Sequence, residues 1–288
     1  MKLPTTVIDI DKMIELAKAF KADGEKTGFV PTMGALHEGH LELVKKARSE
    51  NDRVVVSIFV NPTQFGPNED FEKYPRALEE DMKALAPLGV DAVFVPNAQE
   101  FYPEGFQTYV SNTVTGDKYC GASRPGHFTG VCTVLLKFFH MIFPDKVYMG
   151  LKDYQQYLIV RRMVTDLNLT IDVVGVPTFR EEDGLAYSSR NRRLTREQRE
   201  LAVMMPVALN AAYDLWDEGS RSRRELERAF VDELAKVPDF RLDYVKVCDK
   251  DDLTAEDDKI VKPVVMLAAA WLGDVRLIDN IEFEWSDT

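Results

Sequence analysis

The segment from Arg53 to Val60 limits the possible folds of this 288-residue chain more than any other stretch. Nearly all of its residues are apolar: Val54, Val55, Val56, Ile58, Phe59 and Val60. Such a run is typical of a parallel strand that is buried on both faces of its sheet. Because parallel strands need long crossover connections, helices are expected before and after it.

Short apolar segments and segments of helical spacing alternate over the first two thirds of the chain. Strands are predicted at residues 27–31, 53–60, 92–96, 146–149 and 171–176. Helices are predicted at residues 9–22, 41–49, 76–88, 131–142 and 153–166, the first ended by Gly24. This alternation predicts an α/β fold with a Rossmann-like, mostly parallel, doubly wound sheet.

The pattern changes after Asn191. Capping boxes at Thr195 and Ser222 predict one helix that runs to about Glu218 and a second that ends before Pro238. Three strands are expected at residues 242–248, 264–271 and 275–278. We therefore predict two domains: residues 1–183, which bind ligands, and residues 184–288, a smaller α+β lid.

Charge and composition narrow the class of protein. A net charge of -12 argues against a nucleic-acid partner, which needs a basic surface. The three cysteines (Cys120, Cys132 and Cys248) have no metal-ligand spacing and are expected to be buried thiols. No apolar run approaches the roughly 20 residues of a membrane span, and no signal segment is evident. We expect a cytoplasmic enzyme without a membrane partner.

The first candidate site is the loop after the strand at residues 27–31. Glycines at 34 and 39 allow close approach of a ligand, and the N-terminus of the following helix attracts anions. His37 and His40, three apart, should lie on one side and donate to phosphate. Zinc ligands and merely structural histidines are the alternatives, but no neighbouring Cys or His supplies the remaining ligands of a zinc site. We therefore predict a phosphate site and no metal held by the protein itself.

Two further loops follow strands. Gly150-Leu151-Lys152-Asp153 offers a cation for phosphate and an aspartate that could cap a helix or accept from a ribose hydroxyl. Gly184 to Asn191 offers hydroxyls and a guanidinium. The alternative is a solvated helix cap for the first of these loops and a polar hinge for the second.

Neutral amides mark the third constellation. Asn61 and Gln64 follow the strand at residues 53–60, and Gln156 lies on the helix after Asp153. Amides can hold a carboxylate without the tight ground-state binding that a full cation would give. Loop capping is the alternative.

The pattern His37-Glu38-Gly39-His40 resembles the signature of the nucleotidyltransferase superfamily, which includes class I aminoacyl-tRNA synthetases. A longer set of segments resembles the pantothenate synthetases, also called pantoate–β-alanine ligases. These segments are Pro31 to His40, Ser57 to Gly66, Arg124 to Val131, Lys152 to Gln156 and Asp183 to Asn191.

The resemblance implies that ATP, with Mg²⁺, activates the pantoate carboxylate as an adenylate, and that β-alanine then attacks to give pantothenate and AMP. ATP is a substrate here, and no tightly bound cofactor is expected. The resemblance also implies a homodimer.

The resemblance further implies the roles of single residues. The ATP site would comprise Met33, Gly34, Ala35, Leu36, His37, Glu38, Gly39, His40, Gly150, Leu151, Lys152, Asp153, Phe179, Tyr187, Ser188, Ser189 and Arg190. The residues nearest the chemistry would be His37, His40, Lys152, Ser188 and Arg190. Pantoate and β-alanine would meet Gln64, Gln156, Asn61 and Met33. The second histidine of the signature is assigned proton transfer in the family, but stabilising charge on the phosphates would explain His40 equally well.

Some features depart from the family pattern or leave alternatives. Many relatives have Met, Glu and Val at the positions of Tyr187, Leu151 and Phe179, and we expect activity to survive these changes. His127 matches a family segment without an assigned role.

The alternative function is an adenylyltransferase that transfers AMP without forming an amide. A tRNA synthetase is disfavoured by size and charge, and a nucleotide sensor would not need Gln64 and Gln156.

Overall fold

A computed structural model describes residues 3–66, 71–72 and 74–285 of the chain. They form two compact units. The first unit runs up to Leu151 and resumes at Ile159–Pro177, and the second contains Lys152–Leu158 and everything from Thr178 onward. The predicted domain boundary between residues 183 and 184 stays a prediction.

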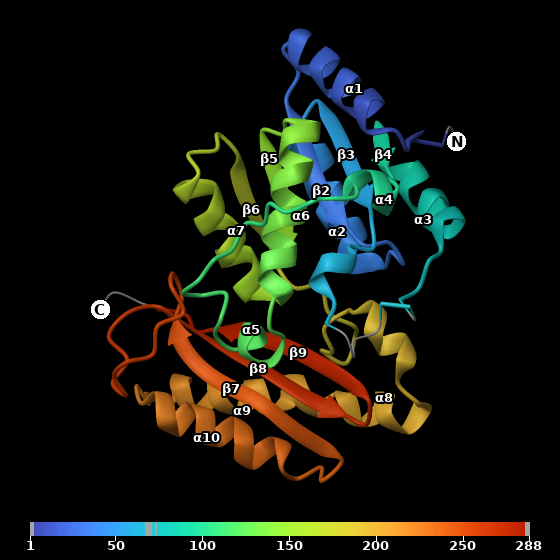
Figure 1. Cartoon of the computed structure of the whole chain (residues 1–288). Coiled ribbons are helices and arrows are strands. Elements are labelled where there is room, and N and C mark those ends of the chain that lie inside the picture. Colours follow the sequence, from blue (N-terminus) through green and yellow to red (C-terminus); the bar gives the residue numbers. More distant parts are fainter. Residues whose placement is uncertain (1–2, 67–70, 73, 286–288) are drawn as a thin grey trace. The chain divides into compact units, whose positions relative to one another are not determined.

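The first unit is built on a parallel sheet with the strand order β1-β4-β3-β2-β5-β6 (Figure 1). Its strands are β1 (Thr5–Val7), β2 (Thr27–Thr32), β3 (Arg53–Ile58), β4 (Ala92–Phe94), β5 (Lys146–Gly150) and β6 (Asp172–Val176). All the pairings between them are parallel, which confirms the predicted sheet. β1 was not predicted, because three residues are too short to show a period.

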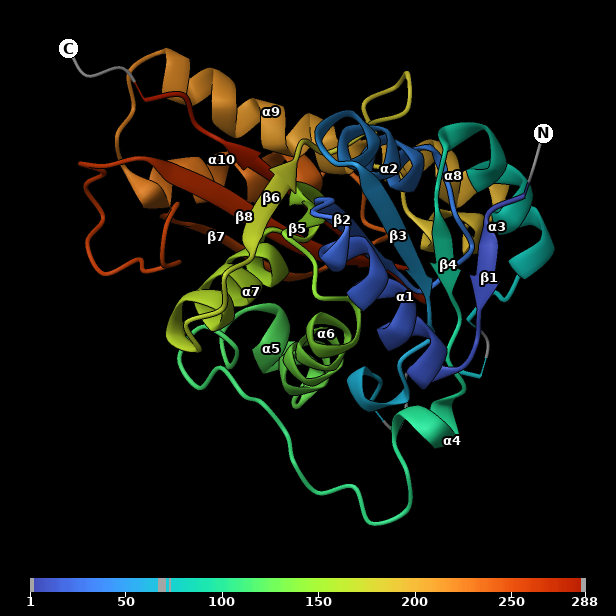
Figure 2. The same cartoon turned by 90° about the horizontal axis from the view of Figure 1, so that it is seen from above.

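Helices cover both faces of this sheet. The helices up to residue 166 are α1 (Ile10–Ala22), α2 (Glu38–Glu50), α3 (Leu78–Leu85), α4 (Ala98–Phe101), α5 (Cys120–Ser123), α6 (His127–Ile142) and α7 (Tyr154–Asp166), with short 3-10 turns η1 (Pro62–Gln64), η2 (Ala86–Leu88) and η3 (Leu151–Asp153). Most of η3 and the start of α7 belong to the second unit. Figure 2 shows α2 on one face and α1 and α6 on the other. The predicted helices are confirmed, although α2 and α6 begin three and four residues earlier than predicted. No helix among the described residues combines the length and apolarity that a membrane crossing requires.

Successive side chains of β2 pack on opposite faces of the sheet, as strand geometry requires. Val30 joins an apolar cluster with Val44 of α2. Phe29 faces the other way, and its ring centroid lies 5.5 Å from that of Phe138 on α6. Phe138 also contacts Phe94 at the end of β4. The sheet is therefore buried on both sides, as the apolar run in β3 predicts.

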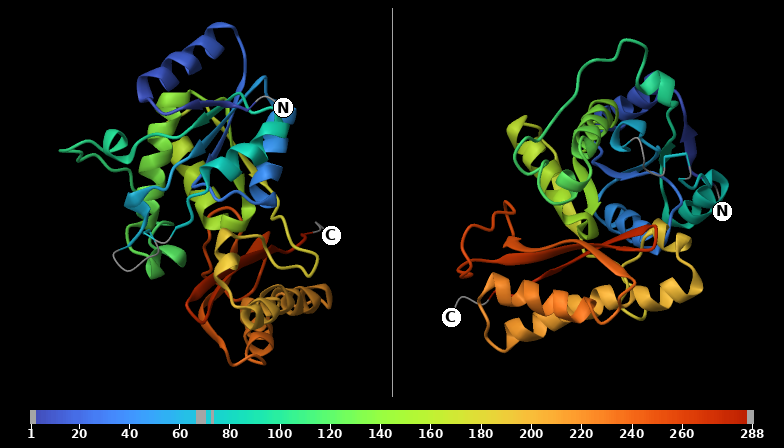
Figure 3. Two further views of the ribbon diagram at one scale, coloured as in Figure 1. Left: turned by 90° about the vertical axis from the view of Figure 1, so that its right-hand side faces the viewer. Right: turned by 60° about the horizontal axis from the view of Figure 1, so that its bottom comes forward.

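The second unit contains a smaller antiparallel sheet in the order β7-β8-β9. Its elements are η4 (Ser189–Arg193), α8 (Arg196–Ala202), α9 (Met204–Asp217), α10 (Arg223–Leu234), β7 (Phe240–Asp249), β8 (Val264–Leu272) and β9 (Val275–Glu282). In Figure 3, α9 and α10 lie together on one face of this sheet. Alternate residues of β8, such as Met266 and Ala268, pack into the cluster that contains Leu209 and Phe230 of these helices. The three predicted strands are confirmed and are longer than predicted.

Two local predictions for this unit were wrong in part. The single helix predicted from Thr195 to Glu218 is interrupted at Val203. Pro206 explains the break, because it has no N–H to donate to the carbonyl of Ala202 and its ring would collide with that carbonyl. The capping box at Thr195 is complete, as predicted.

The capping box predicted at Ser222 is only half formed. Its hydroxyl accepts from the N–H of Glu225. The Glu225 carboxylate, however, accepts from the hydroxyl of Ser220 over 2.6 Å instead of reaching back to the N–H of Ser222. All three cysteines are buried, as predicted.

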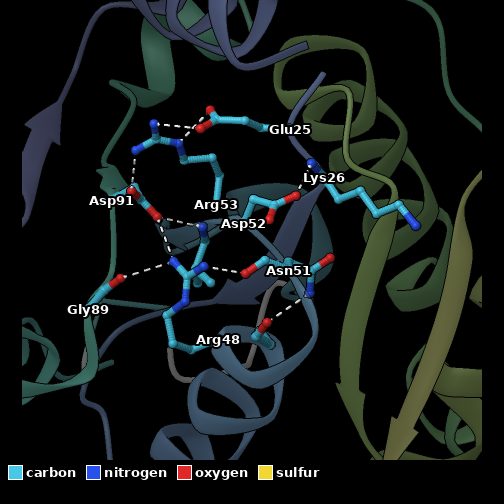
Figure 4. Close-up of polar contacts among 10 residues, drawn as sticks. Glu25, Lys26, Arg48, Asn51, Asp52, Arg53, Gly89 and Asp91 are labelled. Carbon is cyan, nitrogen blue, oxygen red and sulfur yellow. Dashed lines mark hydrogen bonds and ion pairs between the residues drawn. The ribbon is translucent and has the colours of Figure 1, made fainter. Parts of the chain in front are cut away.

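Charged side chains are concentrated where β3 begins (Figure 4). Arg53 donates to both oxygens of Glu25 over 2.6 and 2.8 Å and to Asp91 over 2.9 Å. Arg48 shares Asp91 at 3.0 Å and also donates to the carbonyl of Asn51. These ion pairs join α2 to the segments that enter β3 and β4.

Glu50, at the end of α2, gives a test of this part of the first unit. Hydrogen bonds from Lys46, Tyr148 and Lys146 lower the pKa of its carboxyl to about 2. A lowered folded-state pKa stabilises the fold above the unfolded value of about 4.3, and this stabilisation is lost as pH falls toward 2. We expect the melting temperature of Glu50→Gln to fall less steeply over this range than that of the unchanged chain.

The control for this test is Glu42→Gln, which removes a carboxylate from an exposed pair with Lys45 on the same helix. It should keep the steep dependence. Equal slopes for the unchanged chain and Glu50→Gln in thermal melts from pH 5 to pH 2 would contradict the assignment.

Candidate active site

The predicted ligand loops of the first unit leave the sheet where the strand order reverses. β2 pairs with β3 on one side and with β5 on the other. The carboxyl ends of two such strands mark the usual ligand position in open α/β sheets. Met33 to His40 follows β2, and Gly150 ends β5. The predicted phosphate loop therefore begins at the switch point.

A buried carboxylate that the sequence analysis did not single out fixes the loop after β2. Asp81 of α3 is only 2% exposed. Its oxygens accept the backbone N–H groups of Ala35 over 2.9 Å and Leu36 over 2.7 Å. Gly34 and Ala35 both have a positive φ, 81° and 51°. Because a Cβ on Gly34 would lie 3.0 Å from both the Asp81 carboxylate and Ile58, the loop needs glycine there.

The two histidines meet at the start of α2, as their spacing predicts. His37 is the N-cap, and the centroids of the His37 and His40 rings are 4.0 Å apart. The backbone N–H of His37 donates to Nδ1 of His40 over 3.4 Å. A neutral His40 therefore carries its proton on Nε2, where it can be donated to a ligand. Glu38 and Gly39 are the first residues of the helix, so their N–H groups have no acceptor within it.

The neutral amides of the first unit form a connected group beside this loop. Asn61, which is 1% exposed, caps η1 and donates from its side chain to Oε1 of Gln64 over 3.0 Å. Nε2 of Gln64 in turn lies 3.1 Å from the sulfur of Met33. The hydroxyl of Tyr102 donates to Asn61 over 2.9 Å, and burial raises the pKa of Tyr102 to about 12. The structure therefore brings together the predicted residues Met33, Asn61 and Gln64. Tyr102, which was not predicted, belongs to the same group.

His127, to which the sequence analysis assigned no role, holds the backbone of Gln64. Its Nδ1 lies 2.9 Å from the carbonyl of Gln64, and its Nε2 lies 3.0 Å from Nη1 of Arg124. A carbonyl only accepts and a guanidinium only donates, so His127 is neutral with its proton on Nδ1.

Gly130 lets α6 approach this turn. A Cβ on that residue would lie 2.4 Å from the carbonyl oxygen of Thr63. The segment from Arg124 to Val131 therefore supports η1 through two contacts: the hydrogen bond of His127 to the Gln64 carbonyl and the close approach of the backbones at Gly130.

The remaining predicted residues belong to the second unit. Lys152 and Asp153 end η3, and their charged groups are 3.8 Å apart. Gln156, half-buried, lies in the first turn of α7. Ser188 caps η4 by accepting the N–H of Arg190 over 3.3 Å. Ser189 is the first residue of that turn.

Phe179 and Tyr187 stand opposite each other in a hairpin that precedes η4. The N–H of Tyr187 donates to the carbonyl of Phe179 over 3.0 Å, and the ring centroids are 5.3 Å apart. The Ser-Arg segment is therefore a structured turn, which the sequence analysis predicted only as a loop.

Comparison with known proteins identifies the relatives of this chain. The family model for pantoate-β-alanine ligase matches residues 5–282. Pantothenate synthetase of Moorella thermoacetica is 48% identical over 287 residues, which cover all of both chains. A crystal structure of pantothenate synthetase from Thermus thermophilus superposes with a TM-score of 0.91 at 45% identity and covers 97% of this chain and 100% of that one.

A further solved relative is the pantoate-β-alanine ligase of Francisella tularensis, described in complex with "Beta-gamma ATP" and β-alanine. It has a TM-score of 0.77 and 35% identity, and 97% of each chain is covered. Sequence similarity over the full length and the fold agree, and the chain belongs to the pantoate–β-alanine ligase family.

Proposed function

We propose that this chain uses ATP to condense (R)-pantoate with β-alanine to pantothenate. A pantoate carboxylate oxygen attacks the α-phosphorus of ATP, and the bond to the bridging oxygen of the β-phosphate breaks, so pyrophosphate leaves. The β-alanine nitrogen then attacks the acyl carbon of pantoyl adenylate, AMP leaves, and the nitrogen loses its proton to solvent. The full-length match to the family model carries this proposal.

The phosphates are assigned to the first turn of α2. Its helix end and the rings of His37 and His40 present N–H donors on one short segment. A carboxylate nucleophile has no proton to lose, so we assign His40 the stabilisation of charge on the phosphates as the bond breaks. The stretch from Met33 to His40 lines the nucleotide in this proposal, together with Gly150 and Leu151.

Residues of the second unit supply the other proposed ATP contacts. Lys152 and Arg190 provide cations for the phosphates, and Ser188 and Ser189 provide hydroxyls. Asp153 is assigned to the ribose. The backbone near Phe179 and Tyr187 is assigned to the nucleotide as well.

Gln64 is suited to bind pantoate and then β-alanine, together with Asn61, Met33 and Gln156. The amide of Gln64 donates to a thioether sulfur, which is a weak acceptor. A substrate carboxylate or hydroxyl can replace that partner at little cost. A neutral amide also leaves the carboxylate more nucleophilic than a cation would.

Three further properties complete the proposal. Mg²⁺ accompanies ATP as part of the substrate. Two copies of the chain form a homodimer, and the enzyme acts in the cytoplasm.

The first prediction concerns the reaction itself. Purified protein incubated with ATP, Mg²⁺ and pantoate should form pantoyl adenylate and pyrophosphate, and addition of β-alanine should yield pantothenate and AMP, as followed by mass spectrometry. ADP as the product would refute the mechanism. AMP transfer to an acceptor without an amide product would favour the alternative adenylyltransferase.

The second prediction concerns His40. His40→Ala should slow adenylate formation by roughly 10²–10³-fold in single-turnover experiments, the usual effect of losing a donor to charge that develops in the transition state. The control is His140→Ala, because His140 is an exposed residue of α6. An unchanged rate of adenylate formation in His40→Ala would rule out the assigned role.

The third prediction tests which of the two ring nitrogens of His127 matters for the binding of pantoate. His127→Asn can keep a donor near the position of Nδ1, whereas His127→Gln places its amide near that of Nε2 and loses the contact with the Gln64 carbonyl. Loss of one such hydrogen bond should raise the KM of His127→Gln for pantoate by about 5-fold. His127→Asn should stay within about 2-fold, and the reverse order would contradict the contact as the cause.

A further inference from the structure

The two segments of the second unit that are assigned to ATP are attached to neighbouring residues of one strand. On β9, the side-chain Nδ2 of Asn280 donates to the carbonyl of Lys152 over 2.9 Å. The preceding residue, Asp279, accepts from both terminal nitrogens of Arg180 over 2.7 and 2.9 Å. Asp279 and Asn280 therefore hold η3 at one point and the start of the Ser188 hairpin at another.

Arg180 also contacts the residues that lead to Ser188 in that hairpin. It forms an isolated antiparallel bridge with Ala186, and its Nη1 also donates to the carbonyl of Gly184 over 3.0 Å. Its Nη2 donates to the carbonyl of Asn280 over 3.2 Å. Ser188 follows two residues after Ala186. β9 also lies beside η4, so the turn that carries Arg190 is supported from the same strand.

Both β9 residues are buried polar groups, with Asp279 4% and Asn280 6% exposed. Their neighbours satisfy them, and the N–H of Asn280 donates to Asp279 over 2.8 Å. The Asp279 side chain is 2% exposed and that of Arg180 is 32% exposed. An ion pair with a buried partner adds little to stability, because the desolvation of the buried charge offsets the attraction. The geometry that such a pair imposes is a better account of its presence on a strand surrounded by an apolar core.

We propose that Asp279 and Asn280 are positioning residues for ATP, which together set the spacing between the Lys152 cation and the donors of Ser188 and Arg190. This inference rests on the proposed function. Donors that are fixed before the ligand arrives need no reorganisation during binding and reaction. A strand that holds both segments in register achieves this without contacting the nucleotide.

The test compares Asn280→Ala and Asp279→Asn with the unchanged chain in steady-state assays. Loss of a buried hydrogen bond to either segment should raise the KM for ATP by about 5- to 10-fold. The KM values for pantoate and β-alanine should stay within about 2-fold. If Asn280→Ala does not fold, Asn280→Asp keeps the volume and replaces the donor by an acceptor.

The matched control is Asp243→Asn. Asp243 binds Arg276 of β9 over 2.6 Å, so the variant loses an ion pair between two strands of the same sheet. It should lower the melting temperature and leave the KM for ATP unchanged.

The outcomes separate this inference from the proposed function. An unchanged chain that makes no pantothenate defeats the proposed function. An active unchanged chain whose Asn280 and Asp279 variants keep a normal KM for ATP defeats only the inference. If all three KM values rise, and rise in Asp243→Asn as well, β9 supports the fold in general and not the ATP segments in particular. That result would also overturn the inference.

Discussion

The parallel pairing of β2 with both β3 and β5 is the constraint on which the first unit depends. A strand hydrogen-bonded on both edges and packed on both faces leaves no exposed side for charged residues, and β2 (Thr27–Thr32) has none. Its carboxyl end lies where open α/β sheets usually bind ligands. The loop with His37 and His40 leaves from that end, and the amides of Asn61 and Gln64 follow the neighbouring strand.

The two ends of this sheet differ in chemistry. At the amino end of β3, Arg48, Arg53 and Asp91 saturate one another in ion pairs. At the carboxyl end, the Asp81 carboxylate holds the loop after β2, and the groups described beside it include amides, imidazoles and helix N–H groups, some joined by weaker bonds such as that of Gln64 to the sulfur of Met33. Strong internal pairing stabilises a fold but leaves little capacity for a ligand. The weaker partners can be exchanged for a substrate.

Much of the fold and part of the site were predictable from sequence, for physical reasons. The periods of 2 and 3.6 residues and the caps at Gly24 and Thr195 are local properties, so the sequence shows them without knowledge of the tertiary structure. The interruption at Val203 was also foreseeable, because a proline three residues later removes a helix hydrogen bond. The histidine turn was predictable because its residues are adjacent in the chain.

Long-range partners were not predictable in the same way. Asp81 follows Glu79 and Glu80 in the first turn of α3, where acidic residues usually face solvent, and only tertiary structure shows that one of them is buried. His127 acts on a carbonyl 63 residues away, and Asn280 on one 128 residues away. Because every residue has a backbone carbonyl, the sequence does not show which carbonyl accepts such a bond.

The occupied amides of Ala35 and Leu36 have a consequence for ligand choice. Loops of this kind often offer every N–H group to an anion, which can then bind at several equivalent positions. Here Asp81 already accepts two of them, and its negative charge repels anions from that part of the loop. In the proposed function, the first amides of α2 are the donors assigned to an incoming phosphate. A buried acid beside them would then fix the register of a bound polyanion, because it makes the adjoining register repulsive.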